Sequence, residues 1–371
     1  MKIEMMKYLS DEISDINLLK KLIETLCDKS PEEVTKIVNE LKKCNYNFYV
    51  CEIAINSNVL DKKTIEEQIQ LMKALKECDY DEDACEIATN PDVLDKRTIE
   101  EQIQLMKALK ECDYNFYACE IAINPDVLDK KMIEEQIQLM KALKECDYDE
   151  DACNIAIHPD VLDKRTTEEQ IQLMKALKEC DYDEDAYSIA IKPDVLDKRT
   201  IEEQIQLMKA LKECDYSRDA FSGDAFCIAI NPDVLDKRTT EEQIQLMKAL
   251  KECDYAEDAY IIAIDSDVLD KRTIEEQIQL MRALKECEYN FFAFNIAINP
   301  DVLDKRTTEE QIQLMRVFVL DKRTIKEQIQ LMKALKECDY DGDACEIAID
   351  SDVLDKSTTQ EHTTNESIKR M

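Results

Sequence analysis

Residues 64–97 read TIEEQIQLMKALKECDYDEDACEIATNPDVLDKR, and residues 98–131 read TIEEQIQLMKALKECDYNFYACEIAINPDVLDKK. The same pattern continues along most of the chain. A Val-Leu pair begins at Val59, Val93, Val127, Val161 and Val195, with 34 residues from each pair to the next. A period of this length is typical of stacked helical repeats, so this stretch decides the architecture.

Each unit contains signals for two helices. Residues 64–67, Thr-Ile-Glu-Glu, form a capping box, in which the Thr oxygen accepts from a free backbone N–H and the Glu reaches back. Apolar residues at helical spacing over 65–78 cover a broad arc, which predicts a long helix with neighbours on both sides. A shorter helix is expected over 81–90, because Pro91 cannot continue the hydrogen-bond ladder. We expect residues 91–94 to form a short turn whose Val and Leu fill the core between units.

The fold class we predict is all-α, an α-α superhelix (solenoid) of about nine 34-residue two-helix repeats. Stacked helices lie about 8–10 Å apart, so nine units would extend over about 80–100 Å. Residues 1–27 are expected to be an N-terminal capping helix, and residues 28–316 the helical repeat array. Residues 317–355 hold a truncated junction and the last repeat, because the Val-Leu step from Val302 to Val319 is only 17 residues. The polar tail 356–371 is expected to be disordered.

The two-helix unit resembles HEAT and armadillo arrays. Residues 87–94, IATNPDVL, also resemble the A-x-N-P stretch of leucine-rich-repeat-variant proteins, which are helical solenoids. The resemblance covers roughly residues 28–355, although the repeats of the variant family are shorter than 34 residues. It implies a curved interaction scaffold and carries over no catalytic residue.

Composition excludes several classes of function. The net charge of -34 would repel nucleic acid and an anionic membrane surface, but it suits a basic protein partner or cations. With only two glycines among 371 residues, turns that need a positive φ are expected to be nearly unavailable. The N-terminus has acidic residues where a signal peptide needs an apolar stretch, and no apolar run approaches a membrane span. We therefore expect a cytoplasmic protein, and a monomer.

The sixteen cysteines suggest a metal site or disulfides, but their pattern favours packing. One cysteine position is shared by nearly every repeat. Seven residues later some copies have Cys, as at Cys85, and others have an aromatic residue, as at Tyr187. A ligand cannot be exchanged for an aromatic ring, whereas a small packing residue can. His158 is the only histidine in the array, so no Ser/His/Asp or Cys/His set is expected. We predict no enzyme, no cofactor and no metal site at the cysteines.

The acidic loops leave a second function open. Asp79, Asp81 and Asp83 alternate like the start of a calcium loop, and residues 339–343 come closer still. No acidic residue stands where the closing bidentate ligand should lie, and other copies replace the stretch with residues such as Asn115. We favour capping of the second helix by these acids, with an acidic calcium-binding repeat protein as the alternative.

The second helix varies between copies while the first is nearly constant. Its positions equivalent to 82, 83, 86 and 90 form one outward stripe, which we call the second-helix stripe. A fixed scaffold with a variable surface is the pattern of a modular recognition protein, although neutral drift of a solvated face would look alike. We predict a non-enzymatic protein–protein interaction scaffold that binds a protein or peptide, with a basic one favoured by charge. The residues predicted to bind it are Phe48, Tyr49, Phe116, Tyr117, Phe291, Phe292, Glu82, Asp83, Glu150 and Asp151.

Overall fold

The computed structural model describes residues 9–10, 12–214 and 223–316. These ranges contain 26 helices and no strand, so the predicted all-α class is confirmed. The chain divides into two compact units, Met1–Met208 and Lys209–Met371. The truncated junction predicted at 317–355 and the tail predicted at 356–371 lie outside the described residues.

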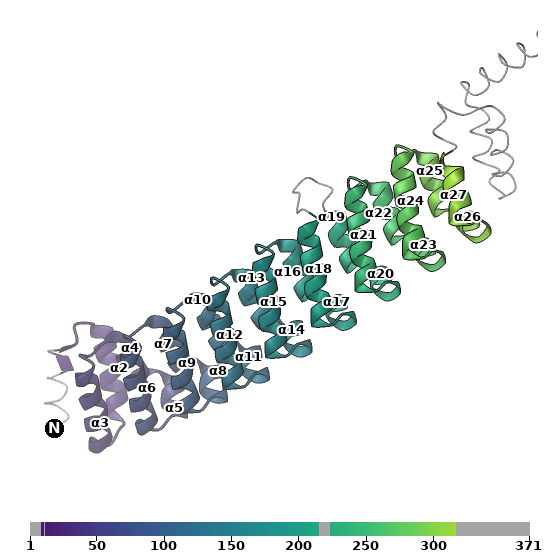
Figure 1. Ribbon diagram of the computed structural model, residues 1–371. Helices are drawn as coiled ribbons and strands as arrows, with labels where there is room; N and C mark the ends of the chain where they lie inside the picture. Colours follow the sequence, from purple (N-terminus) through teal and green to yellow (C-terminus); the bar gives the residue numbers. More distant parts are fainter. Residues whose placement is uncertain (1–8, 11, 215–222, 317–371) are drawn as a thin grey trace, which may run out of the picture. The chain divides into compact units, whose positions relative to one another are not determined.

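Three kinds of helix alternate along the chain (Figure 1). The long helices of 13 residues are α3 (Pro31–Lys43), α6 (Ile65–Glu77), α9 (Ile99–Glu111), α12 (Ile133–Glu145), α15 (Thr167–Glu179), α18 (Ile201–Glu213), α21 (Thr240–Glu252) and α24 (Ile274–Glu286). The second helices are α4 (Phe48–Ile55), α7 (Glu82–Thr89), α10 (Phe116–Ile123), α13 (Glu150–Ile157), α16 (Glu184–Ile191), α19 (Gly223–Ile230), α22 (Glu257–Ile264) and α25 (Phe291–Ile298). The third helices are α5 (Ser57–Lys62), α8 (Pro91–Lys96), α11 (Pro125–Lys130), α14 (Pro159–Lys164), α17 (Pro193–Lys198), α20 (Pro232–Lys237), α23 (Ser266–Lys271) and α26 (Pro300–Lys305). The described repeats end with α27 (Thr308–Met315), and α2 (Ile16–Cys27) precedes them.

The third helix corrects the prediction of a short turn after the second helix. Pro91 ends α7 and also begins α8, because the first position of a helix needs no N–H donor. The Asn90 side chain caps α8 by accepting from the backbone N–H groups of Asp92 and Val93. The predicted role of the Val-Leu pair is confirmed, since Val93 and Leu94 are buried.

Turns with positive φ are present in spite of the scarcity of glycine, so that expectation was wrong. After α6, Asp79 and Tyr80 have φ values of 57° and 59°. The N–H of Tyr80 donates to the carbonyl of Leu75 and that of Asp79 to the carbonyl of Lys76, which is the Schellman pattern of helix termination. Asp and Asn tolerate the left-handed region better than most residues, so they take the place that glycine usually fills. The same pair of positions has positive φ after α3, α9, α12, α15, α21 and α24.

Each repeat packs on the next within each unit. In the first unit the long helices α6, α9, α12 and α15 contact one another in turn, as do the second helices α4, α7, α10 and α13. The third helices α5, α8, α11, α14 and α17 form a third row along the lower edge of the view in Figure 1. Leu71, Met72 and Leu75 are fully buried between these rows, as the broad apolar arc predicts. Long, second and third helices also contact their own kind in the second unit, from α19 to α27.

Lysines tie each repeat to the one before it at the ends of the long helices. The Lys110 Nζ donates to the carbonyl oxygen of Glu77 at 2.6 Å and lies 2.9 Å from a carboxylate oxygen of Asp79. Lys144 and Lys178 make the same two contacts with their preceding repeats. A cation at the negative end of a helix is stabilising, so each long helix is terminated by a side chain of the next repeat.

A buried Arg–Gln contact joins repeats at the opposite end of the long helices. Arg97 Nη2 donates to the carbonyl oxygen of Lys131 at 2.8 Å and to Gln136 Oε1 at 3.2 Å. Gln136 Nε2 in turn donates to the carbonyl oxygens of Ile121 and Ala122, both at 2.9 Å. These carbonyls belong to the last turn of α10, which the following proline leaves without helical partners. The pattern recurs at Arg165 with Gln204, at Arg238 with Gln277 and at Arg272 with Gln311.

Helix α2 covers residues 16–27 of the stretch predicted as a capping helix, and it is preceded by helical residues 9, 10 and 12 and by residues 13–15, which are not helical. Leu18, Leu22 and Leu26 are buried, and α2 contacts α4. Ile16, by contrast, is 79% exposed. Ile16 is the first residue of α2, directly after the N-cap Asp15, and lies off the face formed by Leu18, Leu22 and Leu26.

Candidate partner-binding surface

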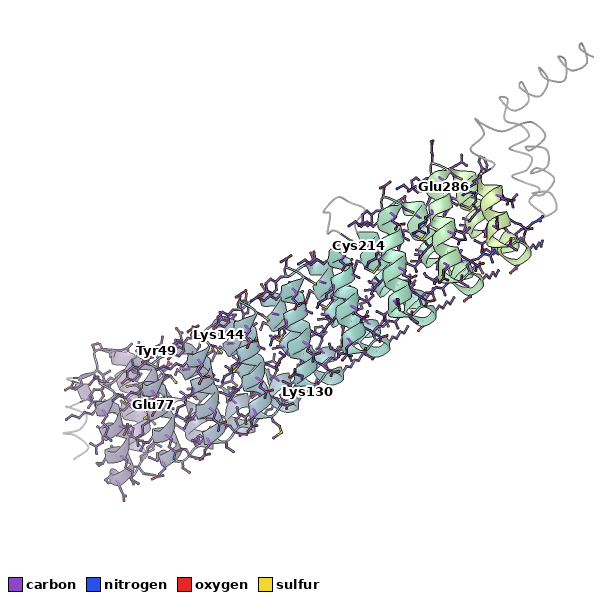
Figure 2. All side chains as sticks on the ribbon, in the orientation of Figure 1. Tyr49, Glu77, Lys130, Lys144, Cys214 and Glu286 are labelled. Atoms are coloured by element: carbon purple, nitrogen blue, oxygen red, sulfur yellow. The ribbon has the colours of Figure 1, made fainter. Side chains whose placement is uncertain are left out.

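The predicted binding residues lie in the first turn of the second helices. In the first unit α4, α7, α10 and α13 follow one another in contact, so their first turns form a row in which aromatic and acidic pairs alternate. Phe48 and Tyr49 are followed by Glu82 and Asp83, and the next two repeats continue with an aromatic and an acidic pair. Figure 2 shows Tyr49 and Lys130 at opposite edges of this unit, which separates the row from the third helices.

The first aromatic residue of each pair is exposed. Phe48, Phe116 and Phe291 are 47%, 61% and 68% exposed, whereas Tyr49, Tyr117 and Phe292 are half-buried. Each pair packs edge to face, with ring centroids 5.4 Å apart for Phe48 and Tyr49. The exposed rings therefore rest against rings that the protein holds in place.

The tyrosines are held by acids of the following repeat. Tyr49 Oη donates to Glu82 Oε2 at 3.1 Å, and Tyr117 Oη donates to Glu150 Oε2 at 3.4 Å. These bonds were not predicted from the sequence. Alternation of aromatic and acidic residues at one position of successive repeats is the signal that could have shown them.

The acids of the loops and of the stripe have different surroundings. Asp81 caps α7 by accepting from the backbone N–H of Ala84, and Asp149 does the same for α13. The predicted capping role is confirmed for Asp81, whereas Asp79 lies 2.9 Å from Lys110 Nζ instead. Glu82 and Glu150 are exposed. Burial, together with neighbouring carboxylates, raises the pKa of Asp83 above its usual range.

Positive charge is missing from the second helices. None of the described ones contains Lys, Arg or His. The charged groups that act on Asp83 are all acidic: Asp81, Glu82 and Glu86. At the two rims, by contrast, acids are paired between repeats, as Asp95 is with Lys62 at 2.7 Å. The acids of the described second helices are therefore not balanced by a basic residue of the same helix.

The cysteines pack as predicted. Cys78 and Cys85 are buried, and the Cys78 thiol donates to the carbonyl oxygen of Met106 in the next repeat. Burial raises the pKa of Cys78 to about 11 and that of Cys85 to about 12. Thiols with such pKa values stay protonated at neutral pH and are poor nucleophiles and metal ligands.

One group of described side chains could offer ligand atoms to a cation. The ligand atoms of Asp83, Glu86 and Cys119 lie within 4.8 Å of one another. The Cys119 thiol is directed at the backbone carbonyl oxygen of Asp83, at 3.8 Å, and burial raises its pKa well above the usual range. Both features favour the protonated thiol, which is not the form that binds a metal.

The sequence of the chain matches no protein-family model and no curated protein. The likeness to HEAT, armadillo and leucine-rich-repeat-variant arrays thus stays a resemblance in the arrangement of helices. In the described part of the chain, no helix is both long enough and apolar enough to cross a bilayer.

Proposed function

We propose that this protein is a non-enzymatic scaffold for protein–protein interaction, and that the second-helix stripe is its binding surface. One observation carries the proposal. The lysine contacts that join the long helices recur from repeat to repeat, while the stripe changes between repeats and has exposed rings and exposed acids. Exposed aromatic side chains on a rigid frame are frequent anchors of protein interfaces.

The stacking of the repeats and the location of the protein are also part of the proposal. The repeats would stack as an α-solenoid like those of HEAT and armadillo arrays, in which one row of helices lines the binding face. We place the protein in the cytoplasm, where buried thiols such as Cys85 stay reduced.

The calcium-binding alternative has less support. Two carboxylates of the first acidic loop already have partners, Asp79 with Lys110 and Asp81 with the N-terminus of α7. Isothermal titration with calcium tests the alternative: a stoichiometry near the number of acidic loops would replace our proposal.

The proposal is tested by capturing partners from the cells that make the protein. The variant Phe48→Ala/Phe116→Ala removes two exposed rings from the stripe. The control, Ile16→Ala/Met132→Ala, removes two exposed apolar side chains outside the stripe, at 79% and 69% exposure. We expect the stripe variant to lose at least about tenfold in partner affinity, since buried aromatic anchors contribute about 2 kcal/mol or more. If both variants bind the partner with equal affinity, the stripe is not the binding surface.

A further inference from the structure

The second-helix stripe of the first unit combines closely spaced acidic side chains with exposed aromatic rings. Its acids lie on four adjacent helices, α7, α10, α13 and α16, which contain no basic residue. Besides burial, neighbouring carboxylates raise the pKa of Asp83, of Asp151 and of Asp185. Negative charges held this close together repel one another, and a cation from another molecule would relieve that repulsion.

The aromatic pairs indicate which kind of cation would fit the stripe. The Tyr49 hydroxyl is bonded to Glu82, and the Phe48 ring packs against Tyr49. The pair therefore presents an aromatic surface whose tyrosine end contacts a carboxylate of the next repeat. Tyr117 and Glu150 repeat the arrangement two units further on. A guanidinium group suits such a place better than an ammonium group, because it can stack on a ring and bond to a carboxylate at once.

We propose that the stripe of the first unit binds an extended segment of a partner protein that is rich in arginine and lysine. This inference rests on the proposed scaffold function and names the chemistry of the partner. Charge complementarity selects the occupant, since helices α7, α10, α13 and α16 contain acids and no basic residue, whereas acids of the rims such as Asp95 are paired with lysines.

The spacing of the repeats sets the spacing of the basic residues. Packed helices lie about 8–10 Å apart, and an extended chain advances about 3.3–3.6 Å per residue. A basic side chain at about every third position would then meet each repeat in turn. Arginine is expected opposite the aromatic pairs, and either basic residue opposite the acidic pairs.

The direct test measures binding of a labelled oligo-arginine peptide to the full chain. The stripe variant is Glu82→Gln/Asp83→Asn/Glu150→Gln/Asp151→Asn. The control is Glu100→Gln/Glu134→Gln/Glu168→Gln/Glu202→Gln, which removes the same charge from exposed acids in the first turns of long helices. We expect the stripe variant to bind about tenfold more weakly and the control less than about twofold, because exposed ion pairs act mainly at short range. Equal weakening would mean diffuse attraction to an acidic protein and would overturn the inference.

A second measurement isolates the aromatic contribution. The native chain should prefer oligo-arginine to oligo-lysine by about threefold, and Phe48→Ala/Phe116→Ala should abolish this preference while leaving oligo-lysine binding unchanged. Persistence of the preference in that variant would exclude the rings from the site.

Selection from an unbiased peptide library separates this inference from the proposed function. Enrichment of basic peptides that depend on the stripe supports both. Enrichment of acidic or uncharged peptides that depend on the stripe keeps the scaffold function and overturns the basic partner. Peptides that bind equally well to the stripe variant would overturn both.

Discussion

The junctions at Arg97 and Lys131 lie one repeat apart and are almost equally buried, with 9% and 7% of the side chain exposed. Arg97 bonds both to a backbone carbonyl and to Gln136 Oε1. Lys131 Nζ reaches the carbonyl oxygen of Arg165 at 3.4 Å, and Gln170 Oε1 is buried with no protein partner among the described residues. Gln170 Nε2 has a contact to Ala156 at 3.4 Å, where Gln136 has two at 2.9 Å.

The difference shows how one substitution acts on another repeat. A guanidinium group presents several N–H donors in a rigid plane, and an ammonium group presents one compact charge. The residue that depends on this choice is a glutamine 39 residues further along the chain. Replacing Arg with Lys at a junction is therefore not conservative, even though the charge is unchanged.

The largest effect is expected from removing the two glutamines in turn. Gln136→Leu removes one of the two acceptors of Arg97 Nη2 and leaves the carbonyls of Ile121 and Ala122 without a donor, so it should cost about 3 kcal/mol of folding free energy. Gln170→Leu should cost about 1 kcal/mol or less, since fewer good hydrogen bonds are lost. Urea unfolding together with native-state hydrogen exchange of α12 and α15 measures both. Equal losses would mean that the two junctions do not differ in energy.

Exchanging the two basic residues tests the comparison directly. Arg97→Lys should destabilise by about 1.5 kcal/mol, because Gln136 loses a charged donor. Lys131→Arg should stabilise by about 1 kcal/mol by giving Gln170 Oε1 a partner. The double exchange should be close to neutral in urea unfolding. A Lys131→Arg variant with unchanged or reduced stability would contradict this account.

The residue next to Lys131 also differs from the other repeats, and changing it should have a smaller effect on stability. Met132 stands at the N-cap of α12, where most other repeats have Thr, and has no hydroxyl to accept from the backbone. Glu135 still accepts from the Met132 N–H, so half of the capping box remains. Met132→Thr should restore the other half and add about 1 kcal/mol to the stability of the repeat. Met132→Val is the matched control with the same branching and no hydroxyl, and it should give no such gain.

The smallest effect is a pH dependence confined to one junction. Burial lowers the pKa of Lys131 from its ordinary value of 10.5, so above the lowered pKa the folded chain binds fewer protons there than the unfolded chain. Its contribution to stability therefore rises with pH between the lowered value and 10.5. The advantage of Lys131→Arg should shrink as unfolding is followed from neutral pH to about pH 10. A constant advantage over that range would show that Lys131 keeps its proton.

Much of the local structure could be predicted from the sequence, because its signals are local. The capping box at residues 64–67 and the apolar arc after it gave the long helix, and the variable cysteine position gave the packing role of Cys85. The third helix was missed because Pro91 was interpreted only as a stop. The left-handed turn at residues 79–80 was missed because glycine was taken as its requirement.

Contacts between repeats could not be predicted in the same way. The bond from Tyr49 to Glu82 joins residues 33 apart, and the bond from Arg97 to Gln136 joins residues 39 apart. Whether two such side chains meet depends on how one repeat is placed on the next, which no short stretch of sequence encodes. The predicted binding residues remain a prediction, although the structure shows which of them are exposed and which bond to each other.

The contacts of the lysines have a consequence for how the gene can change in length. Lys110 bonds to residue 77 and Lys144 to residue 111, which is the same separation of 33 residues. A tandem duplication that copies 34 residues, wherever its ends fall, recreates a donor for every acceptor and an acceptor for every donor. Unequal crossing-over between the near-identical copies can therefore add or remove whole repeats without new compensating mutations. The number of second helices in the row is then heritable in discrete steps.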